Sequence, residues 1–124
     1  MVIDGVANAV DHFITATLSN LEAGTLARDE ETRTNAHLFV CGAIMYLADY
    51  DEVDKASTDE LVVVKLKEHF DLDTAGANAV IAMLDRVSPK DARHIFLIEG
   101  ASALRRWIAD ADKSASVKLK ELTN

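Results

Sequence analysis

Apolar residues along this chain recur at intervals of three and four positions far more often than at intervals of two. A spacing of three and four places apolar side chains on one face of an α-helix, whereas strict alternation is typical of a strand. Glycine and proline are scarce, so few positions interrupt the pattern. The sequence therefore predicts an all-α protein, a bundle of about five helices in a single domain over residues 1–124.

The first predicted helix lies within residues 1–24 and is amphipathic. Its apolar stripe runs from Ile3 to Leu21, and Gly24 offers a stop. A second helix is expected to begin near Asp29, because acidic residues at 29–31 complement the positive end of a helix, and to run to about Asp49. This second segment is apolar nearly all round, which predicts the central helix of the bundle.

A third helix is expected to begin at Ser57. Ser57 and Glu60 have the spacing of a capping box, in which each side chain accepts a hydrogen bond from a free backbone N–H. The β-branched run at 61–64 could instead form a short strand, but helical spacing resumes after it and no hairpin partner follows. The pattern therefore favours a helix through this run.

A fourth helix is expected after a break at residues 71–73, entered through Asp73 or Thr74 and marked by apolar residues as far as Val87. A last long helix is expected from Pro89 to about Asp110.

The predicted start of this last helix rests on Ser88 before Pro89, with Asp91 three positions after the serine. Its expected buried residues are Phe96, Leu97, Leu104, Trp107 and Ile108. The tail, residues 113–124, is expected to be short or frayed, forming a turn or two.

The composition of the chain mainly excludes certain classes of partner. The chain has 124 residues, 49% apolar and 27% charged, which suits one folded domain with a single core. Its net charge of −8 would repel a phosphate backbone or an anionic membrane surface, so nucleic acid and membranes are not expected partners.

The expected location is the cytoplasm. A single cysteine, Cys41, cannot form an internal disulfide, and a reducing compartment suits a buried thiol. The apolar run from Ala36 to Ala48 is too short to span a bilayer, and the first residues lack the basic start of a secretory signal.

Six of the twelve residues from Asp49 to Glu60 are carboxylates, placed between two apolar segments. Counted against the calcium-binding helix–loop–helix template, Asp49, Asp51, Ser57 and Glu60 fall at ligand positions 1, 3, 9 and 12. Carboxylate oxygens suit hard divalent cations such as Ca²⁺ or Mg²⁺. Position 5 is Val53, however, and no glycine stands at the sharp turn. The alternative is that the acids simply solvate a turn between two helices.

A weaker second set of acids repeats this spacing. Asp110, Asp112 and Glu121 each lie 61 residues after Asp49, Asp51 and Glu60, which resembles a decayed internal duplication of a helix and its acidic loop. Lysines at 113, 118 and 120 would compete for these carboxylates, so this second set is expected to be degenerate or non-binding.

The segment around the first loop also resembles a known family. A helix ending in Ala-Asp, an acidic loop, Ser57 with Glu60 three residues on, and then LVVVKLKEHFDLDTAGANAVIAML are similar to the tellurite-resistance TerB-like family over roughly residues 36–87. The resemblance implies an all-helical fold and acidic loops that bind calcium or similar cations. It also implies an association with stress or tellurite resistance, without a firmly assigned reaction.

Carried over by position, the ligand candidates that the TerB-like resemblance implies are Asp49, Asp51, Asp54, Ser57 and Glu60. This sequence has Val53 and Asp54 where that family usually has Asp-Gly.

Other clusters of reactive residues are interpreted as structural. His37 and Cys41 stand four apart and could share a helix face, but two ligands do not complete a zinc site and core packing is favoured. Asp91 and His94 are interpreted as a cap and a surface residue. No nucleophile or phosphate-binding motif is present, so an enzyme is disfavoured.

The sequence thus predicts a cytoplasmic protein that binds a divalent cation at the loop between its second and third helices. The main alternative is a partner-binding module without a metal, in which two copies pair through the first helix as a homodimer. That helix could equally pack on its own bundle, which is the favoured interpretation.

Overall fold

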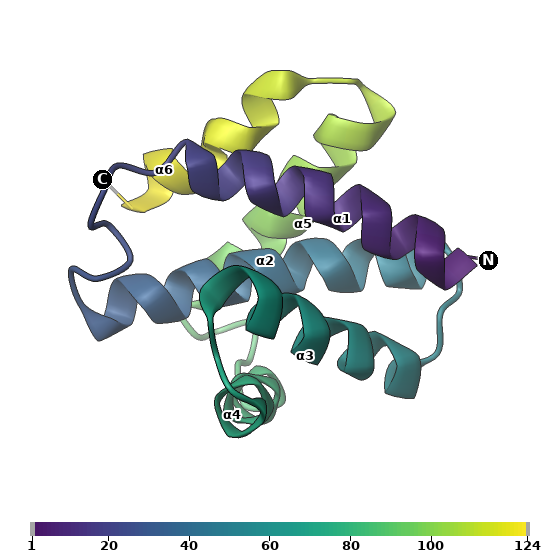
Figure 1. Ribbon diagram of the computed structural model, residues 1–124, viewed down its shortest axis with the longest axis horizontal. Coiled ribbons are helices and arrows are strands. Elements are labelled where there is room, and N and C mark those ends of the chain that lie inside the picture. The colour runs from purple at the N-terminus through teal and green to yellow at the C-terminus, as the bar shows by residue number, and fades with distance from the viewer. Residues whose placement is uncertain (1, 124) are drawn as a thin grey trace.

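A computed structural model describes residues 2–123, with side chains from residue 5, and among these residues it contains helices and no strands. The α-helices are α1 (Val2–Ser19), α2 (Glu30–Tyr50), α3 (Lys55–Phe70), α4 (Thr74–Leu84), α5 (His94–Ala109) and α6 (Lys118–Thr123), and a 3-10 helix, η1 (Lys113–Val117), precedes α6. The predicted all-α, single-domain bundle is confirmed (Figure 1). None of the helices in the described part is both long and apolar enough to cross a lipid bilayer.

The central position of α2 is also confirmed. Every residue from Leu38 to Ile44 is buried, and α2 contacts each of the other α-helices. Figure 1 shows α2 in the middle of the bundle, with α1, α3 and α5 around it. This arrangement follows from the sequence, because a helix that is apolar on all sides must be covered on all sides.

The contact between α2 and α5 depends on two glycines. A Cβ atom added at Gly42 would collide with the backbone carbonyl of Leu97, and one added at Gly100 would collide with the carbonyl of Phe39. The absence of both Cβ atoms therefore lets the two helix backbones approach closely where they cross.

Two predicted helix starts are confirmed by their caps. The Asp29 carboxylate accepts a hydrogen bond from the backbone N–H of Thr32 at 2.7 Å, and the Asp73 carboxylate accepts one from Gly76 at 2.7 Å. Each aspartate satisfies a donor that the helix itself leaves unpaired.

The predicted start of α3 is wrong. The capping residue is Asp54, whose carboxylate accepts a hydrogen bond from the backbone N–H of Ser57 at 2.7 Å, and the helix begins at Lys55. Ser57 therefore lies inside the first turn and does not form a capping box with Glu60. Aspartate and serine are both strong N-caps, and here Asp54, which comes first along the chain, takes the capping position.

The predicted boundaries on either side of Pro89 are also wrong. α4 ends at Leu84 instead of near Val87, and α5 begins at His94, which leaves Asp91 in a turn. The Asp91 carboxylate accepts hydrogen bonds from the backbone N–H of Arg93 at 2.9 Å and from its guanidinium at 2.8 Å. These hydrogen bonds, the guanidinium first, lower the pKa of Asp91 to about 2. A carboxylate held by a neighbouring arginine is not available to cap a helix at Ser88.

The expected core of α5 is only partly correct. Leu104 is fully buried and Phe96, Leu97 and Trp107 are partly buried, but Ile108 is 45% exposed. Trp107 packs edge-to-face on Phe13 of α1, with ring centroids 5.8 Å apart.

The C-terminal tail is more ordered than expected. Leu119 is fully buried, and the side-chain amide of Asn20 donates to the Ser116 hydroxyl at 2.9 Å. The expected short turns are present as η1 and α6, but residues 113–123 are not frayed, because both segments pack on α1 and α5. Asn124 lies outside the described residues.

The apolar stripe of α1 packs on the chain's own bundle. Val6, Val10, Phe13 and Ile14 are almost completely buried. The side chain of Ile3, the first residue of the predicted stripe, lies outside the described side chains. The favoured interpretation, that this helix packs on its own bundle, agrees with this burial, and pairing of two copies stays an untested alternative.

Candidate functional site

A groove with a volume of about 630 Å³ lies between α2, α3, α4 and α5. Its walls are mainly apolar and include Met45, Val62, Ile81, Leu84, Leu97 and Ile98. A cavity of this size is within the range of about 300–1,000 Å³ that is usual for ligand sites. We therefore take this groove as the candidate functional site.

The groove exists because α4 and α5 stand apart. No Cα atom of α4 lies within 8 Å of one in α5, although residues 85–93 link the two helices directly. Within this link the Arg93 guanidinium pairs with Asp91 and lies 3.5 Å from the sulfur of Met83, in the last turn of α4.

Three carboxylates, from three different helices, line the groove beside its apolar walls. Asp49 lies in the last turn of α2, Asp59 in the beginning of α3, and Asp85 caps the C-terminus of α4. The last turns of α2 and α4 contain no basic residue, so their free carbonyl groups add partial negative charge.

Among the residues that line the groove, Lys55 supplies the one ammonium group beside these three acids. Lys55 Nζ lies 2.9 Å from an Asp59 oxygen, and this hydrogen bond raises the pKa of Lys55, with a further contribution from the charge of Asp85. The groove therefore combines an apolar interior with an excess of negative charge at its edge. Such a site attracts a ligand that has an apolar body and a positive group.

The predicted cation ligands do not share one function in the structure. Asp49 lines the groove, Asp51 caps the C-terminus of α2, and Asp54 caps the N-terminus of α3. Ser57 supplies the N–H of that cap, and the hydrogen bond lowers the pKa of Asp54. Glu60 is exposed on α3.

These five residues do not gather into a ligand cluster. Within the described part of the chain, the only group of three or more His, Cys, Asp or Glu ligand atoms within 4.8 Å of one another is that of Asp11, Glu68 and His69. Binding of Ca²⁺ or Mg²⁺ at the loop stays a prediction, which would require the loop acids to move together.

The second acidic set is equally dispersed. Asp110 caps the C-terminus of α5, Asp112 caps η1 through Ser114, and Glu121 is exposed on α6. The residue after each C-cap has a left-handed backbone conformation: Ala111 follows Asp110, with φ of 50°, and Glu52 follows Asp51 in the first loop, with φ of 60°. In conformation Asp110 therefore corresponds to Asp51 and not to Asp49, so the matched spacing in the sequence is out of register with the backbone.

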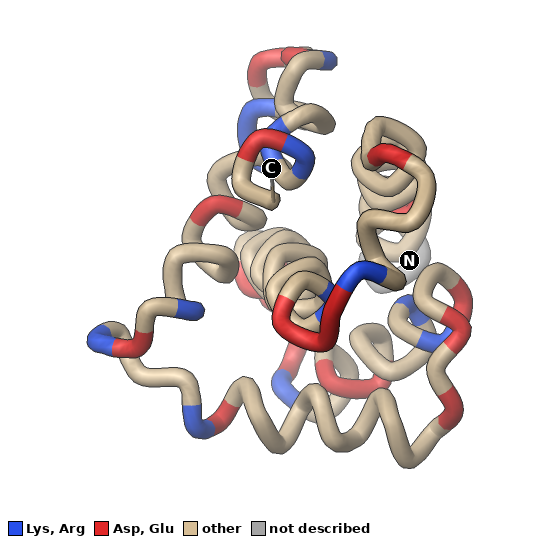
Figure 2. The backbone as a smooth tube through the Cα atoms, turned by 90° about the vertical axis from the view of Figure 1, so that its left-hand side faces the viewer, with Lys and Arg blue, Asp and Glu red and all other residues tan. Residues whose placement is uncertain are grey.

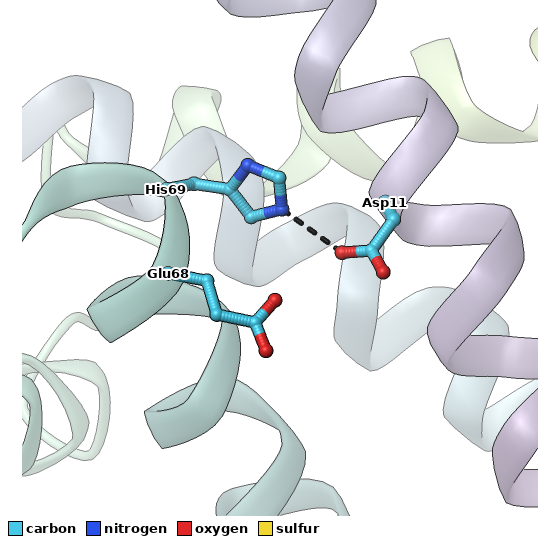
Figure 3. Close-up of side chains that lie close together, drawn as sticks. All are labelled: Asp11, Glu68 and His69. Atoms are coloured by element: carbon cyan, nitrogen blue, oxygen red, sulfur yellow. Dashed lines mark hydrogen bonds and ion pairs between the residues drawn. The ribbon is translucent and has the colours of Figure 1, made fainter.

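The Asp11, Glu68 and His69 cluster joins α1 to α3 (Figure 3). His69 Nε2 lies 2.9 Å from an Asp11 oxygen, and the Lys65 ammonium lies 2.8 Å from the same oxygen and 3.3 Å from Glu68. The side chain of Lys65 is only 5% exposed. Its ammonium already occupies the position that a bound cation would need, so the cluster is an internal ion-pair network.

Partial burial alone would raise the pKa of Asp11, but hydrogen bonds from Lys65 and His69 outweigh it, and the net effect lowers this pKa. This network was not predicted from the sequence, because Asp11 and His69 are far apart along the chain. A lysine within an apolar helical run was the one signal available.

His37 and Cys41, which the sequence left as a possible metal or thiolate pair but favoured as core residues, do not form a reactive thiol site. Complete burial raises the pKa of Cys41 to about 12, and burial together with the charge of Arg33 lowers the pKa of His37 to about 4. The His37 ring packs edge-to-face on Phe70, with centroids 4.7 Å apart. Both side chains are packed into the bundle, as the favoured interpretation expected.

Searches of family models, curated proteins and solved structures find no match to this chain. The TerB-like resemblance therefore stays a prediction, and the function must be inferred from the groove.

Proposed function

We propose that this chain is a binding protein whose groove between α2, α3, α4 and α5 holds an apolar ligand that carries positive charge. The observation that supports the proposal is the combination of apolar walls with three carboxylates and a single ammonium at the groove. Apolar contact supplies most of the affinity, at about 0.8 kcal/mol for each buried methylene group. The carboxylates select the sign of the ligand's charge.

The direct test is calorimetric titration of the chain with octyltrimethylammonium and with octyl sulfate, both below their micellar concentrations. The two probes share an alkyl chain and differ in the charge of the headgroup. We expect saturable binding of the cationic probe and at least about tenfold weaker binding of the anionic one. No binding of either probe, or equal binding of both, would contradict the proposal.

Two isoleucines of α5 provide a matched pair of variants. Ile98 lines the groove and is 51% exposed, whereas Ile108 is 45% exposed but lies outside the groove. Because both side chains are half exposed, neither Ile98→Lys nor Ile108→Lys is expected to unfold the bundle. Ile98→Lys is expected to abolish binding of octyltrimethylammonium, and Ile108→Lys to leave it unchanged. Circular dichroism of each variant checks that the helices are intact.

The divalent-cation function predicted from the sequence is separate from this proposal. Calorimetry with Ca²⁺ and Mg²⁺ on the wild type and on Glu60→Gln tests it, since Glu60 is exposed and makes no cap. Location in the cytoplasm and a role in stress or tellurite resistance likewise stay predictions.

A further inference from the structure

We infer that the natural occupant of the groove is a basic amphipathic helix of a partner protein. This inference rests on the proposed function and names the class of ligand. The first observation concerns α4, whose eleven residues include no charged side chain although only Ala77 and Val80 are buried. Figure 2 shows α4 along the bottom of the molecule, without an acidic or basic residue between its two ends. α4 contributes Ile81 and Leu84 to the groove, so this wall presents apolar side chains and no charge of its own to a partner.

The second observation is that the apolar surface extends beyond the cavity itself. Met45 and Ile98 line the groove and remain 42% and 51% exposed. Ile95, one turn earlier on α5 than Ile98, is 45% exposed and continues the apolar surface along the helix. An elongated apolar strip is typical of a groove that takes a helix, whereas a small molecule needs only an enclosed cavity.

The length of the groove fits such a helix. Its lining runs along α2 from Gly42 to Asp49 and along α5 from His94 to Ala101. Each stretch is two helical turns, or about 10 Å. A partner helix that places apolar anchors at positions i, i+3 or i+4, and i+7 covers the same distance. The groove is therefore long enough to take three anchor side chains.

The charges around the groove determine which sign of charge a partner must carry. Asp49 and Asp85 lie at the C-terminal ends of α2 and α4, Asp59 lies in the second turn of α3, and the chain as a whole carries a net charge of −8. A second copy of this chain would bring two acidic surfaces together, which is unfavourable. A partner helix with Lys or Arg beside its apolar anchors would instead pair with these carboxylates.

The experiment uses two synthetic helical peptides of about 14 residues, long enough for three anchors and flanking charges. Both carry leucine at the same anchor positions, and the flanking residues are lysine in one peptide and glutamate in the other. Fluorescence anisotropy measures their binding to the full chain at about 50 mM and about 300 mM salt. We expect the lysine peptide to bind at least about tenfold more tightly than the glutamate peptide, and to weaken as salt is raised.

Variants locate the binding. Ile98→Lys is expected to abolish binding of the lysine peptide, and the matched Ile108→Lys to preserve it. The double variant Asp49→Asn with Asp85→Asn is expected to weaken binding severalfold and to reduce its dependence on salt. Equal binding of the two peptides, or a lysine peptide that is insensitive to Ile98→Lys, would overturn the inference.

The outcome for octyltrimethylammonium separates this inference from the proposed function. If that probe binds and neither peptide does, the groove is a small-molecule site and the helix partner is wrong. If neither the probe nor the peptides bind, both proposals fail.

Discussion

Substitution of Gly100 by alanine tests the close crossing of α2 and α5 on which the shape of the groove depends. In an ordinary helix this change is stabilising by about 1 kcal/mol, because alanine has the higher helix propensity. At Gly100, however, the new Cβ would collide with the carbonyl of Phe39. That atom belongs to the backbone of the central helix, so it cannot rotate away as a side chain could.

The expected magnitude follows from these two opposing effects. Overpacking of a tight contact costs about 1–3 kcal/mol, and a collision with backbone belongs near the upper limit of that range. After the gain in propensity, we expect Gly100→Ala to lower the free energy of unfolding by about 1–2 kcal/mol. For a chain of this length, that corresponds to a fall in melting temperature of roughly 3–12 °C.

Urea denaturation followed by circular dichroism measures the change, and Gly5→Ala is the matched control. Gly5 is also a helical glycine, but a Cβ added there has nothing within 4 Å. We expect Gly5→Ala to be neutral or to stabilise by about 0.5 kcal/mol. If Gly100→Ala proves as stable as the wild type or as Gly5→Ala, the two helices do not cross as closely as described.

The remaining predictions concern the tail, the ion-pair network and the buried thiol. Leu119→Ala is expected to lower the free energy of unfolding by about 2–4 kcal/mol in urea denaturation, because Leu119 is fully buried; a loss below about 0.5 kcal/mol would indicate a frayed tail after all. Asp11 has a lowered pKa, so its stabilisation is present above the usual value of 3.8 and is lost as the pH falls through the folded-state value. Melting temperatures of Asp11→Asn are therefore expected to fall less on acidification than those of the wild type, and parallel pH profiles would refute this. Cys41, whose pKa is raised to about 12 by burial, is expected to react with a thiol reagent only after denaturant is added, and prompt labelling of the native chain would show that it is accessible.

Helix positions were predictable from the sequence where a single local signal was present. Asp29 and Asp73 cap helices three residues from their hydrogen-bond donors, and both starts were predicted correctly. The same reasoning failed at Ser57 and at Ser88, because in each case another group was better placed. Asp54 caps α3 first, and Arg93 engages the aspartate that was expected to support a helix start. Competition between nearby polar groups is a matter of geometry that spacing alone does not specify.

Features that depend on contacts between distant segments were not predictable. Leu119 is buried because α6 packs on α1 and α5, and no local pattern in the tail indicates this. The groove has the same origin, since its walls come from four helices. The glycines at 42 and 100 were visible as isolated glycines within helical patterns, which often mark close backbone approach. The lack of charge in α4 was also visible, and it is the signal that could have indicated a binding surface.

Methyl-group NMR of the chain during titration with octyltrimethylammonium tests the binding groove most directly. The methyl signals of Met45 and Ile98 report on the groove, and that of Ile108 reports on exposed surface of the same helix outside it. Binding in the groove predicts saturable shifts of Met45 and Ile98 with no change at Ile108. Equal, unsaturated shifts at all three residues, or none at any of them, would contradict the assignment of this groove as the functional site.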